Sequence, residues 1–286
     1  MQCLFVSDLH GHVGRYEKLF EAVSSERPAA LFLGGDLLPM RGVAWQPDGS
    51  SYDSFLESFL IPRFDDLRSA MGSDYPAVFV ILGNDDLRAE EDKVLEGEAQ
   101  GTWTYVHGRR AELNGYSVYG YACVPPTPFM LKDWERYDVS RFVDPGGVTP
   151  EAGRRSVTHD EHEVRYGTIL RDLEELVGDA DLRSAVFLFH SPPYRTMLDR
   201  AALDGRKVDH VPLDVHVGSI AMRRFIEARQ PRITLHGHVH ESVSITGEWH
   251  DRIGRTHLFG AGHDGPELAV VRFDPGEPEK ASRELL

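Results

Sequence analysis

Residues 2–12 read QCLFVSDLHGH, and this stretch decides the fold class. Its apolar start, residues 2–6, is short and nearly continuous, which predicts a strand buried on both faces. Asp8 and His10 follow directly, and apolar residues at helical spacing begin at Val13. A strand that passes through a polar turn into a helix is the repeating unit of α/β folds.

The same unit recurs along the chain. Further buried strands are predicted by apolar runs at residues 29–33, 77–82, 185–189 and 232–235. Apolar residues at helical spacing lie between the strands, over residues 13–23, 52–59, 164–177 and 220–226. Pro62 should end or kink the second of these helices, and Ser219 should cap the fourth. We therefore expect an α/β protein.

Two groups of strand-like runs have no helix between them, which predicts antiparallel hairpins and hence mixed sheets. One group joins residues 103–106 to residues 116–122, and the other contains residues 243–246, 256–259 and 268–273.

The rest of the chain is irregular. Residues 125–160 are rich in Pro and Gly, and we expect a long ordered loop over the end of the sheet that carries the site. For residues 144–156, an insertion without a role is an equally good interpretation. Residues 274–286 predict a polar, frayed C-terminal tail, which leaves a single domain over residues 1–273.

Composition excludes several classes of protein. The 286 residues carry a formal net charge of −15, which argues against sequence-independent binding to nucleic acid and against binding to an anionic membrane. Two cysteines rule out a disulfide scaffold and a cysteine-rich zinc module. Apolar runs such as residues 77–82 are too short to span a bilayer, and no targeting signal is visible, so we expect a cytoplasmic protein.

A polar cluster follows each of the five predicted buried strands, at the end where α/β proteins form their sites. Asp, Asn and His are ligands of divalent metals of intermediate hardness. Seven residues are too many for one ion and suit two ions, about 3.5–4 Å apart, that share a bridging carboxylate. The candidate ligands are Asp8, His10, Asp36, Asn84, His190, His238 and His240.

The ordered series of clusters resembles the calcineurin-like metallophosphoesterases over most of the chain, from Ser7 to His240. The matching motifs are Asp8-x-His10, Gly34-Gly35-Asp36, Gly83-Asn84-Asp85-Asp86, His190 and Gly237-His238-Val239-His240. The resemblance implies a four-layer αββα sandwich of two mixed sheets flanked by helices. It also implies that Asp8, His10, Asp36 and His240 hold one ion, that Asp36, Asn84, His190 and His238 hold the other, and that a water between the ions attacks phosphorus in line.

The chain departs from the family pattern at Asp85, where the family usually has a His beside the leaving-group oxygen. An ionised Asp cannot donate a proton there, and two nearby cations would keep its pKa low. Replacement donors are His12, His216 and His263, each of which could instead be an exposed or structural histidine. Asp85 and His12 are therefore our catalytic candidates, and Asn84, His216 and His263 are our substrate-binding candidates.

The expected function is hydrolysis of a small phosphorylated substrate, with phosphodiesters and other activated esters favoured. A phosphomonoesterase or protein phosphatase is the alternative among enzymes. A catalytically weak metal-binding protein that binds a phosphorylated ligand is the alternative from another class. The cofactors would be two divalent ions, for which Mn, Fe, Zn and Ni all suit the ligands and Mn is favoured.

Overall fold

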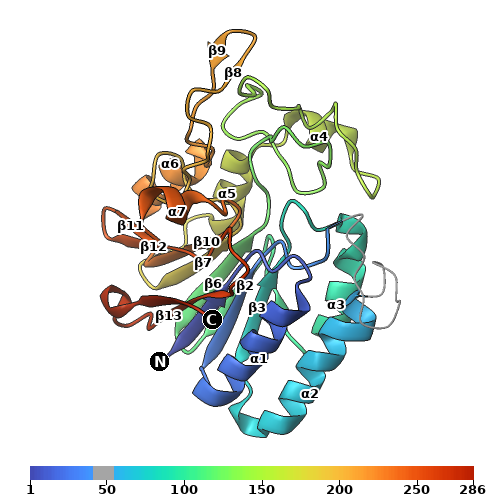
Figure 1. Ribbon diagram of the computed structural model, residues 1–286, viewed down its shortest axis with the longest axis vertical. Coiled ribbons are helices and arrows are strands. Elements are labelled where there is room, and N and C mark those ends of the chain that lie inside the picture. The colour runs from blue at the N-terminus through green and yellow to red at the C-terminus, as the bar shows by residue number, and fades with distance from the viewer. Residues whose placement is uncertain (41–54) are drawn as a thin grey trace.

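Two six-stranded sheets form the centre of the computed structural model, which describes residues 1–40 and 55–286 (Figure 1). The first sheet has the order β14 (Ser282–Leu285), β13 (Ala269–Phe273), β1 (Cys3–Val6), β2 (Ala30–Gly34), β3 (Ala77–Ile81) and β4 (Thr104–Tyr105). Strands β1 to β4 are parallel, whereas β13 runs antiparallel to β1 and β14 antiparallel to β13.

The second sheet has the order β11 (His250–Ile253), β12 (Thr256–Gly260), β10 (Ile233–His236), β7 (Ala185–Phe189), β6 (Tyr116–Tyr121) and β5 (Arg110–Leu113). Its four inner strands are parallel and its two edge strands are antiparallel to their neighbours. A small hairpin, β8 (Lys207–Val208) and β9 (Val211–Pro212), projects away from both sheets (Figure 1).

Helices flank the two sheets. The helices beside the first sheet are α1 (Val13–Glu26), α2 (Ile61–Met71) and α3 (Glu91–Ala99), and those beside the second are α5 (Ile169–Val177) and α6 (Ile220–Arg229) (Figure 1). The shorter helices are α4 (Glu161–Tyr166), α7 (Ser242–Thr246), a π-helix η2 (Leu56–Leu60), and the 3₁₀ turns η3 (Gly72–Asp74), η4 (Arg88–Glu90) and η5 (Pro278–Lys280). The layered α/β arrangement with two mixed sheets is thereby confirmed.

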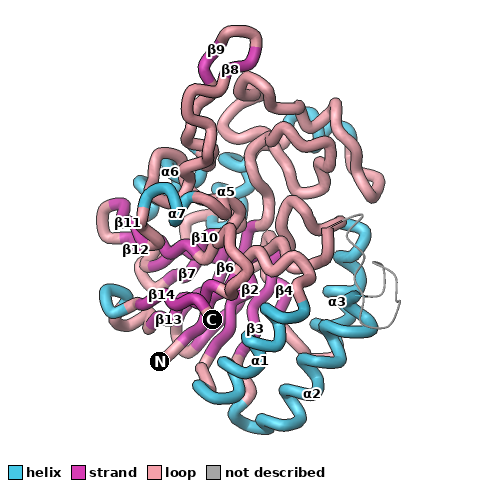
Figure 2. Tube along the Cα trace, in the orientation of Figure 1, coloured by secondary structure: helices cyan, strands magenta, loops and turns pink. Residues whose placement is uncertain are grey.

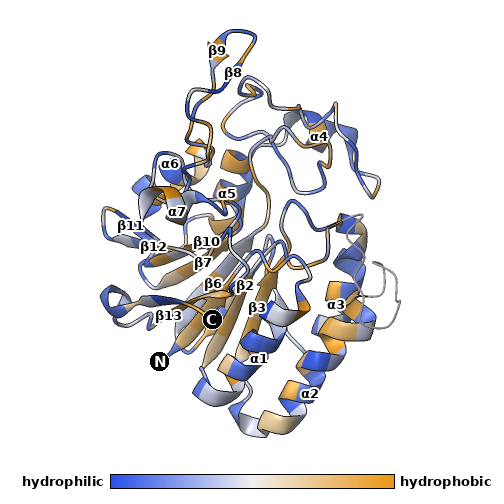
Figure 3. Ribbon diagram, viewed as in Figure 1, coloured by the Kyte–Doolittle hydropathy of each residue, from blue (hydrophilic) through white to orange (hydrophobic). Residues whose placement is uncertain are grey.

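The two sheets pack on one another through a continuous apolar core. Phe259 of β12 and Phe273 of β13 bring their ring centroids to 5.8 Å, which joins the sheets, and Phe273 also packs on Phe32 of β2. The inner strands of both sheets are mostly apolar, and α1, α2 and α3 carry polar residues alongside apolar ones (Figure 3). Among the described residues, no helix combines the length and the apolar composition needed to cross a bilayer.

The predicted strands at residues 2–6, 29–33, 77–82, 185–189 and 232–235 are all present, displaced by at most about one residue. Ser219 caps α6 as expected, because its hydroxyl accepts a hydrogen bond from the Met222 amide. The long loop lies over one end of the sheets (Figure 2). The Trp134 indole donates to the Asp86 carbonyl, and the Asp138 carboxylate accepts from the Ile220 amide, so the loop is anchored at both places.

Several sequence predictions of local structure are wrong. Residues 104–105 pair with β3 in the first sheet, and the hairpin partner of β6 is β5, which is largely exposed and so lacks an apolar signal. Residues 243–246 form α7, which ends at Gly247 with φ of 77°, although their β-branched residues favour a strand. The predicted tail is also wrong in part, since β14 pairs with β13 and Leu286 exchanges two backbone hydrogen bonds with Leu268.

Two predicted helices differ in their limits. Pro62 lies in the first turn of α2, which continues directly from the π-helix η2, so the helix does not end at Pro62. The start of the predicted helix 52–59 lies outside the described residues. The helix predicted over residues 164–177 is divided into α4 and α5, with Gly167 as the C-cap of α4.

Candidate metal centre

The carboxyl ends of five strands deliver polar side chains to one place between the two sheets. β1, β2 and β3 of the first sheet precede Asp8, Asp36 and Asn84, and β7 and β10 of the second precede His190 and His238. The backbone ties these ends together, because the Asp8 amide donates to the Gly35 carbonyl at 3.0 Å and the Gly237 amide donates to the His190 carbonyl at 2.9 Å. Both sheets thus contribute to a single cluster.

The cluster consists of two overlapping groups of potential metal ligands. In each group, the ligand atoms all lie within 4.8 Å of one another. One group is Asp8, His10, Asp36 and His240, and the other is Asp36, His190 and His238. Asn84 joins the second group, since its Oδ1 lies 3.1 Å from His190 Nε2. All seven predicted ligands are therefore together, and Asp36 belongs to both groups.

Unusual backbone geometry aims these side chains. Asp8, His10, Asp36 and His238 have φ values of 59°, 46°, 52° and 70°, in the left-handed region that non-glycine residues seldom adopt. Such conformations cost on the order of 1 kcal/mol or more each, and persist where the surrounding structure enforces them. The loops that follow β2 and β3 approach each other so closely that a Cβ atom at Gly83 would collide with Asp36 Oδ1.

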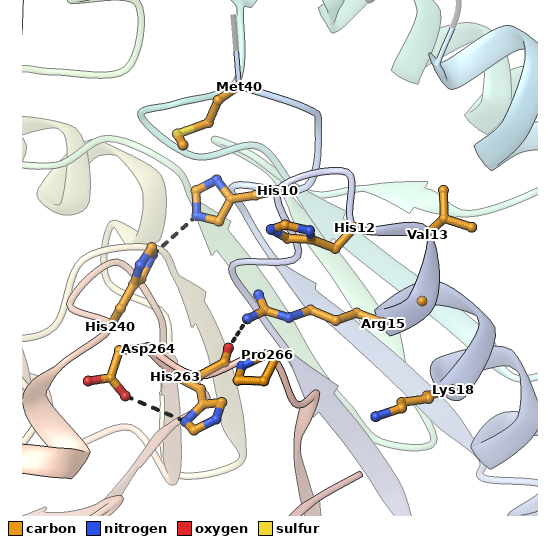
Figure 4. Close-up of a pocket in the computed structure, with 12 residues that line it drawn as sticks. His10, His12, Val13, Arg15, Lys18, Met40, His240, His263, Asp264 and Pro266 are labelled. Carbon is orange, nitrogen blue, oxygen red and sulfur yellow. Dashed lines mark hydrogen bonds and ion pairs between the residues drawn. The ribbon is translucent and has the colours of Figure 1, made fainter. Parts of the chain in front are cut away.

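The buried donors fit a divalent cation. Asp8 Oδ2, His10 Nδ1 and His238 Nδ1 are buried without a hydrogen-bond partner among the described residues. The Nε2 atoms of His10 and His240 lie only 3.2 Å apart, with the two rings pointing toward one another (Figure 4). An unpaired buried polar atom costs about 1–3 kcal/mol, which a bound cation would remove. Imidazole, carboxylate and amide donors in this mixture suit Mn, Fe, Zn or Ni.

The electrostatics of the cluster point the same way. Burial alone would lower the pKa of His190, but the Asp36 carboxylate, whose Oδ2 lies 3.2 Å from His190 Nε2, raises that pKa to about 10. Burial would likewise raise the pKa of Asp36, and His190 outweighs burial and lowers it. Two buried carboxylates therefore favour positive charge beside them, which a divalent cation would supply.

The comparisons with known proteins agree with this geometry. A protein-family model described as calcineurin-like phosphoesterase matches residues 1–242. The chain belongs to the calcineurin-like phosphoesterase family. This is a family of hydrolases that use divalent metals, and the resemblance seen in the sequence is confirmed.

Individual relatives add little about activity. The uncharacterized protein MJ1162 of Methanocaldococcus jannaschii is 37% identical over 117 residues, which are 40% of this chain and 44% of that protein. The match therefore spans less than half the length of this curated relative. The crystal structure of TT1561 of Thermus thermophilus matches this chain with a TM-score of 0.53 at 17% identity. Another solved structure matches it with a TM-score of 0.59 at 18% identity, and each match covers 99% of this chain and 98% of the other chain. At these identities, the likeness shows the fold alone.

Asp85, the departure from the family pattern, lies within the cluster. Its amide donates to Asp36 Oδ1 at 2.8 Å, its Oδ1 accepts from Asn84 Nδ2 at 3.0 Å, and its Oδ2 lies 3.9 Å from His10 Nδ1. Burial, followed by the charge of Asp36, raises the pKa of Asp85 to about 6 in the metal-free protein. The backbone of Asp85 orients Asp36, and Asp85 also lines a cavity that reaches the cluster.

His12 and His263 share a cavity of about 570 Å³ that reaches the cluster at His10 and His240 (Figure 4). His12 is at the N-cap position of α1 but makes no capping hydrogen bond. His263 Nε2 lies 2.9 Å from the carboxylate of Glu267. Both histidines therefore border the predicted site, as members of a polar wall that also includes Arg15 and Lys18 (Figure 4).

His216 lies on the wall of a different cavity, which reaches the cluster at Asn84 and Asp85. Its Nδ1 is 2.8 Å from Oδ1 of Asp199, a fully buried carboxylate that also accepts hydrogen bonds from the backbone amides of Arg195, Thr196 and Gly218. The three replacement histidines are therefore divided between two cavities.

Two residues outside the predicted ligand set support the cluster. Asp86 is fully buried and accepts hydrogen bonds from the amides of Leu37, Leu38 and Gly83, so it ties the loop after β2 to the loop after β3. Burial raises the pKa of Asp86 to about 8. Arg15 donates to the Asp8 carbonyl at 2.7 Å and to the Gly265 carbonyl. Asp86 belongs to the Gly83-Asn84-Asp85-Asp86 motif, whereas no motif includes Arg15, whose partner Gly265 is distant in sequence.

Proposed function

We propose that this protein is a divalent-metal-dependent phosphoesterase that favours phosphodiesters and other activated phosphate esters. The observation that carries the proposal is the buried Asp36 carboxylate, which belongs to two groups of potential metal ligands at once. A shared carboxylate between two such groups is the arrangement of dinuclear hydrolytic sites. The preferred metal is Mn, and the substrate is a small phosphorylated molecule; the cytoplasmic location expected from the sequence stays a prediction.

The ligands would divide as the resemblance implies. Asp8, His10, Asp36 and His240 would hold one ion, and Asp36, Asn84, His190 and His238 the other. Divalent ions bound there would supply positive charge to the phosphate oxygens and lower the pKa of an attacking water.

Contacts around the ligands set their orientation. His190 Nδ1 lies 2.8 Å from the Gly34 carbonyl, which favours a proton on Nδ1 and directs Nε2 toward Asp36. The His238 amide donates to Asp8 Oδ1 at 3.0 Å, which holds that carboxylate in place. These contacts are formed by groups of the protein itself, so they would orient the ligands toward a bound ion.

The preference for activated esters follows from Asp85. An ionised carboxylate beside the leaving oxygen offers it no proton, so esters whose oxygen leaves readily as an anion should react best. His12, His216 and His263 stay candidates for a proton donor or a substrate contact, since each lines a cavity that reaches the cluster.

Metal analysis combined with an ester panel tests the proposal. Protein stripped with chelator and reloaded with Mn²⁺ should bind two ions per chain and hydrolyse bis(p-nitrophenyl) phosphate faster than p-nitrophenyl phosphate. Asp36→Asn should abolish hydrolysis, whereas the exposed Asp92→Asn on α3 should not. Failure to bind metal would refute the proposal.

The same panel separates the alternatives. Faster hydrolysis of the monoester would favour a phosphomonoesterase or protein phosphatase. Two bound ions without turnover of any ester would favour a metal-dependent binding protein, the interpretation that Asp85 supports.

A further inference from the structure

A cavity of about 600 Å³ extends from the candidate metal centre into the long loop and the β8–β9 hairpin. At its inner end lie Asp36, Asn84, Asp85, His238 and His240. Its outer walls come from residues 125–129, 138–140 and 142–147 of the loop, and from residues on both sides of the hairpin. This volume is typical of sites that enclose a small organic molecule.

The outer walls are mostly apolar. Phe129 and Phe142 line the cavity and are 60% and 71% exposed. Aromatic residues with so much exposed surface often contact a bound molecule. Val208 and Leu213 of the hairpin segment and Val143 of the loop face the same space. A group that filled the cavity would remove this apolar surface from water.

The charge of the walls is one-sided. Among the described residues that line this cavity there is no lysine or arginine, whereas Asp144, Asp214 and Glu241 all contribute to it. Burial and the charge of Asp214 raise the pKa of Asp144. The other cavity at the metal centre, in contrast, contains Arg15 and Lys18.

We infer that this cavity binds the organic group of the phosphoester, and that this group is bulky, apolar and free of negative charge. The inference rests on the proposed function, because the phosphate must lie at the metal centre for its substituent to enter the cavity. A second phosphate or a carboxylate on that group would meet acidic walls, and no lysine or arginine among the described lining residues would compensate for its charge. His216, whose Nδ1 is held by Asp199, leaves Nε2 as a positioned polar contact in the cavity.

Binding of phosphonates to the Mn²⁺-loaded protein, measured by calorimetry, tests this without requiring turnover. Benzylphosphonate should bind at least about tenfold more tightly than methylphosphonate, because burial of even half of a phenyl ring is worth about a factor of ten. p-Carboxybenzylphosphonate should lose most of that advantage. Equal affinity for all three would overturn the inference.

Matched variants locate the binding. Val208→Trp should fill the cavity and abolish the advantage of benzylphosphonate while leaving methylphosphonate unchanged, whereas Val211→Trp, on the neighbouring strand of the hairpin but outside the cavity, should preserve it. Asp144→Asn should reduce the discrimination against the carboxylate, and Asp209→Asn, which does not line the cavity, should not. An advantage that survives Val208→Trp would place the organic group elsewhere and overturn the inference.

Hydrolysis of bis(p-nitrophenyl) phosphate, measured on the same preparation, keeps the two hypotheses apart. Hydrolysis with no preference among the phosphonates would overturn the cavity assignment and retain the phosphoesterase. The expected preference without hydrolysis would retain the cavity assignment and overturn the phosphoesterase.

Discussion

Removing the Asp36 carboxylate should empty both halves of the metal centre, whereas removing the Asn84 amide should empty one. Asp36 belongs to both ligand groups, and its Oδ2 lies 3.2 Å from His190 Nε2. Asn84 contacts only the second group, through His190. Asp36→Ala should therefore bind no Mn²⁺ tightly, and Asn84→Ala should retain one ion per chain.

The size of the effect follows from linkage. An ion present at a hundred times its dissociation constant stabilises the folded state by about 2.7 kcal/mol, so two ions contribute about 5 kcal/mol. For a chain of this size, each kcal/mol raises Tm by about 2–4 °C. Saturating Mn²⁺ should thus raise the Tm of the wild type by roughly 10–20 °C, that of Asn84→Ala by about half as much, and that of Asp36→Ala by almost nothing.

Thermal unfolding with Mn²⁺ and with chelator measures these shifts, and metal analysis counts the ions. Asp92→Ala, an exposed substitution on α3, serves as the control and should respond like the wild type. An Asp36→Ala protein that keeps two tightly bound ions, or gains the full increase in Tm, would refute the bridging role. A wild type shown to be metal-free that responds to neither reagent would refute the centre itself.

Three further substitutions have defined outcomes. General acids supply about 10²–10⁴-fold in rate, and Asp85→His should recover part of this for alkyl esters with little change for nitrophenyl esters. The control Asp85→Asn should show no such gain, and similar wild-type rates on both ester types would contradict the prediction. Asp86→Ala leaves three backbone amides unpaired and should reduce the free energy of unfolding by about 4 kcal/mol in urea titration, and a loss below about 1 kcal/mol would show that the loops do not depend on it. Lys132→Met leaves the buried Glu135 carboxylate in the long loop without its cation and should lower the free energy of unfolding by about 3–5 kcal/mol in the same assay. The double variant with Glu135→Leu should regain most of this stability, and equal losses in both variants would exclude this explanation.

The outline of the site could be predicted because its signals are local. A buried parallel strand appears in the sequence as a short apolar run, and the residues that follow it must be polar if they form a metal site. Asp8, Asp36, Asn84, His190 and His238 all stand just beyond such runs. The ligand types, their order and an α/β class with mixed sheets therefore followed from the sequence. The resemblance added the four-layer arrangement and how the ligands would divide.

Other features depend on contacts between distant segments, which no local pattern encodes. Strand β5 is exposed and β14 lies at a sheet edge, so each is a strand only because a neighbour offers unpaired backbone groups. The left-handed backbone at Asp36 needs hydrogen bonds from other loops. Whether His216 shares a cavity with His12 depends on how the long loop and the hairpin fold over the sheet edge, and the tertiary structure separates the two. The sequence determined which chemical groups meet at the centre, and only the packing of loops determined the apolar, acidic space beside it, because loop packing is set by long-range contacts that leave no periodic signal in the chain.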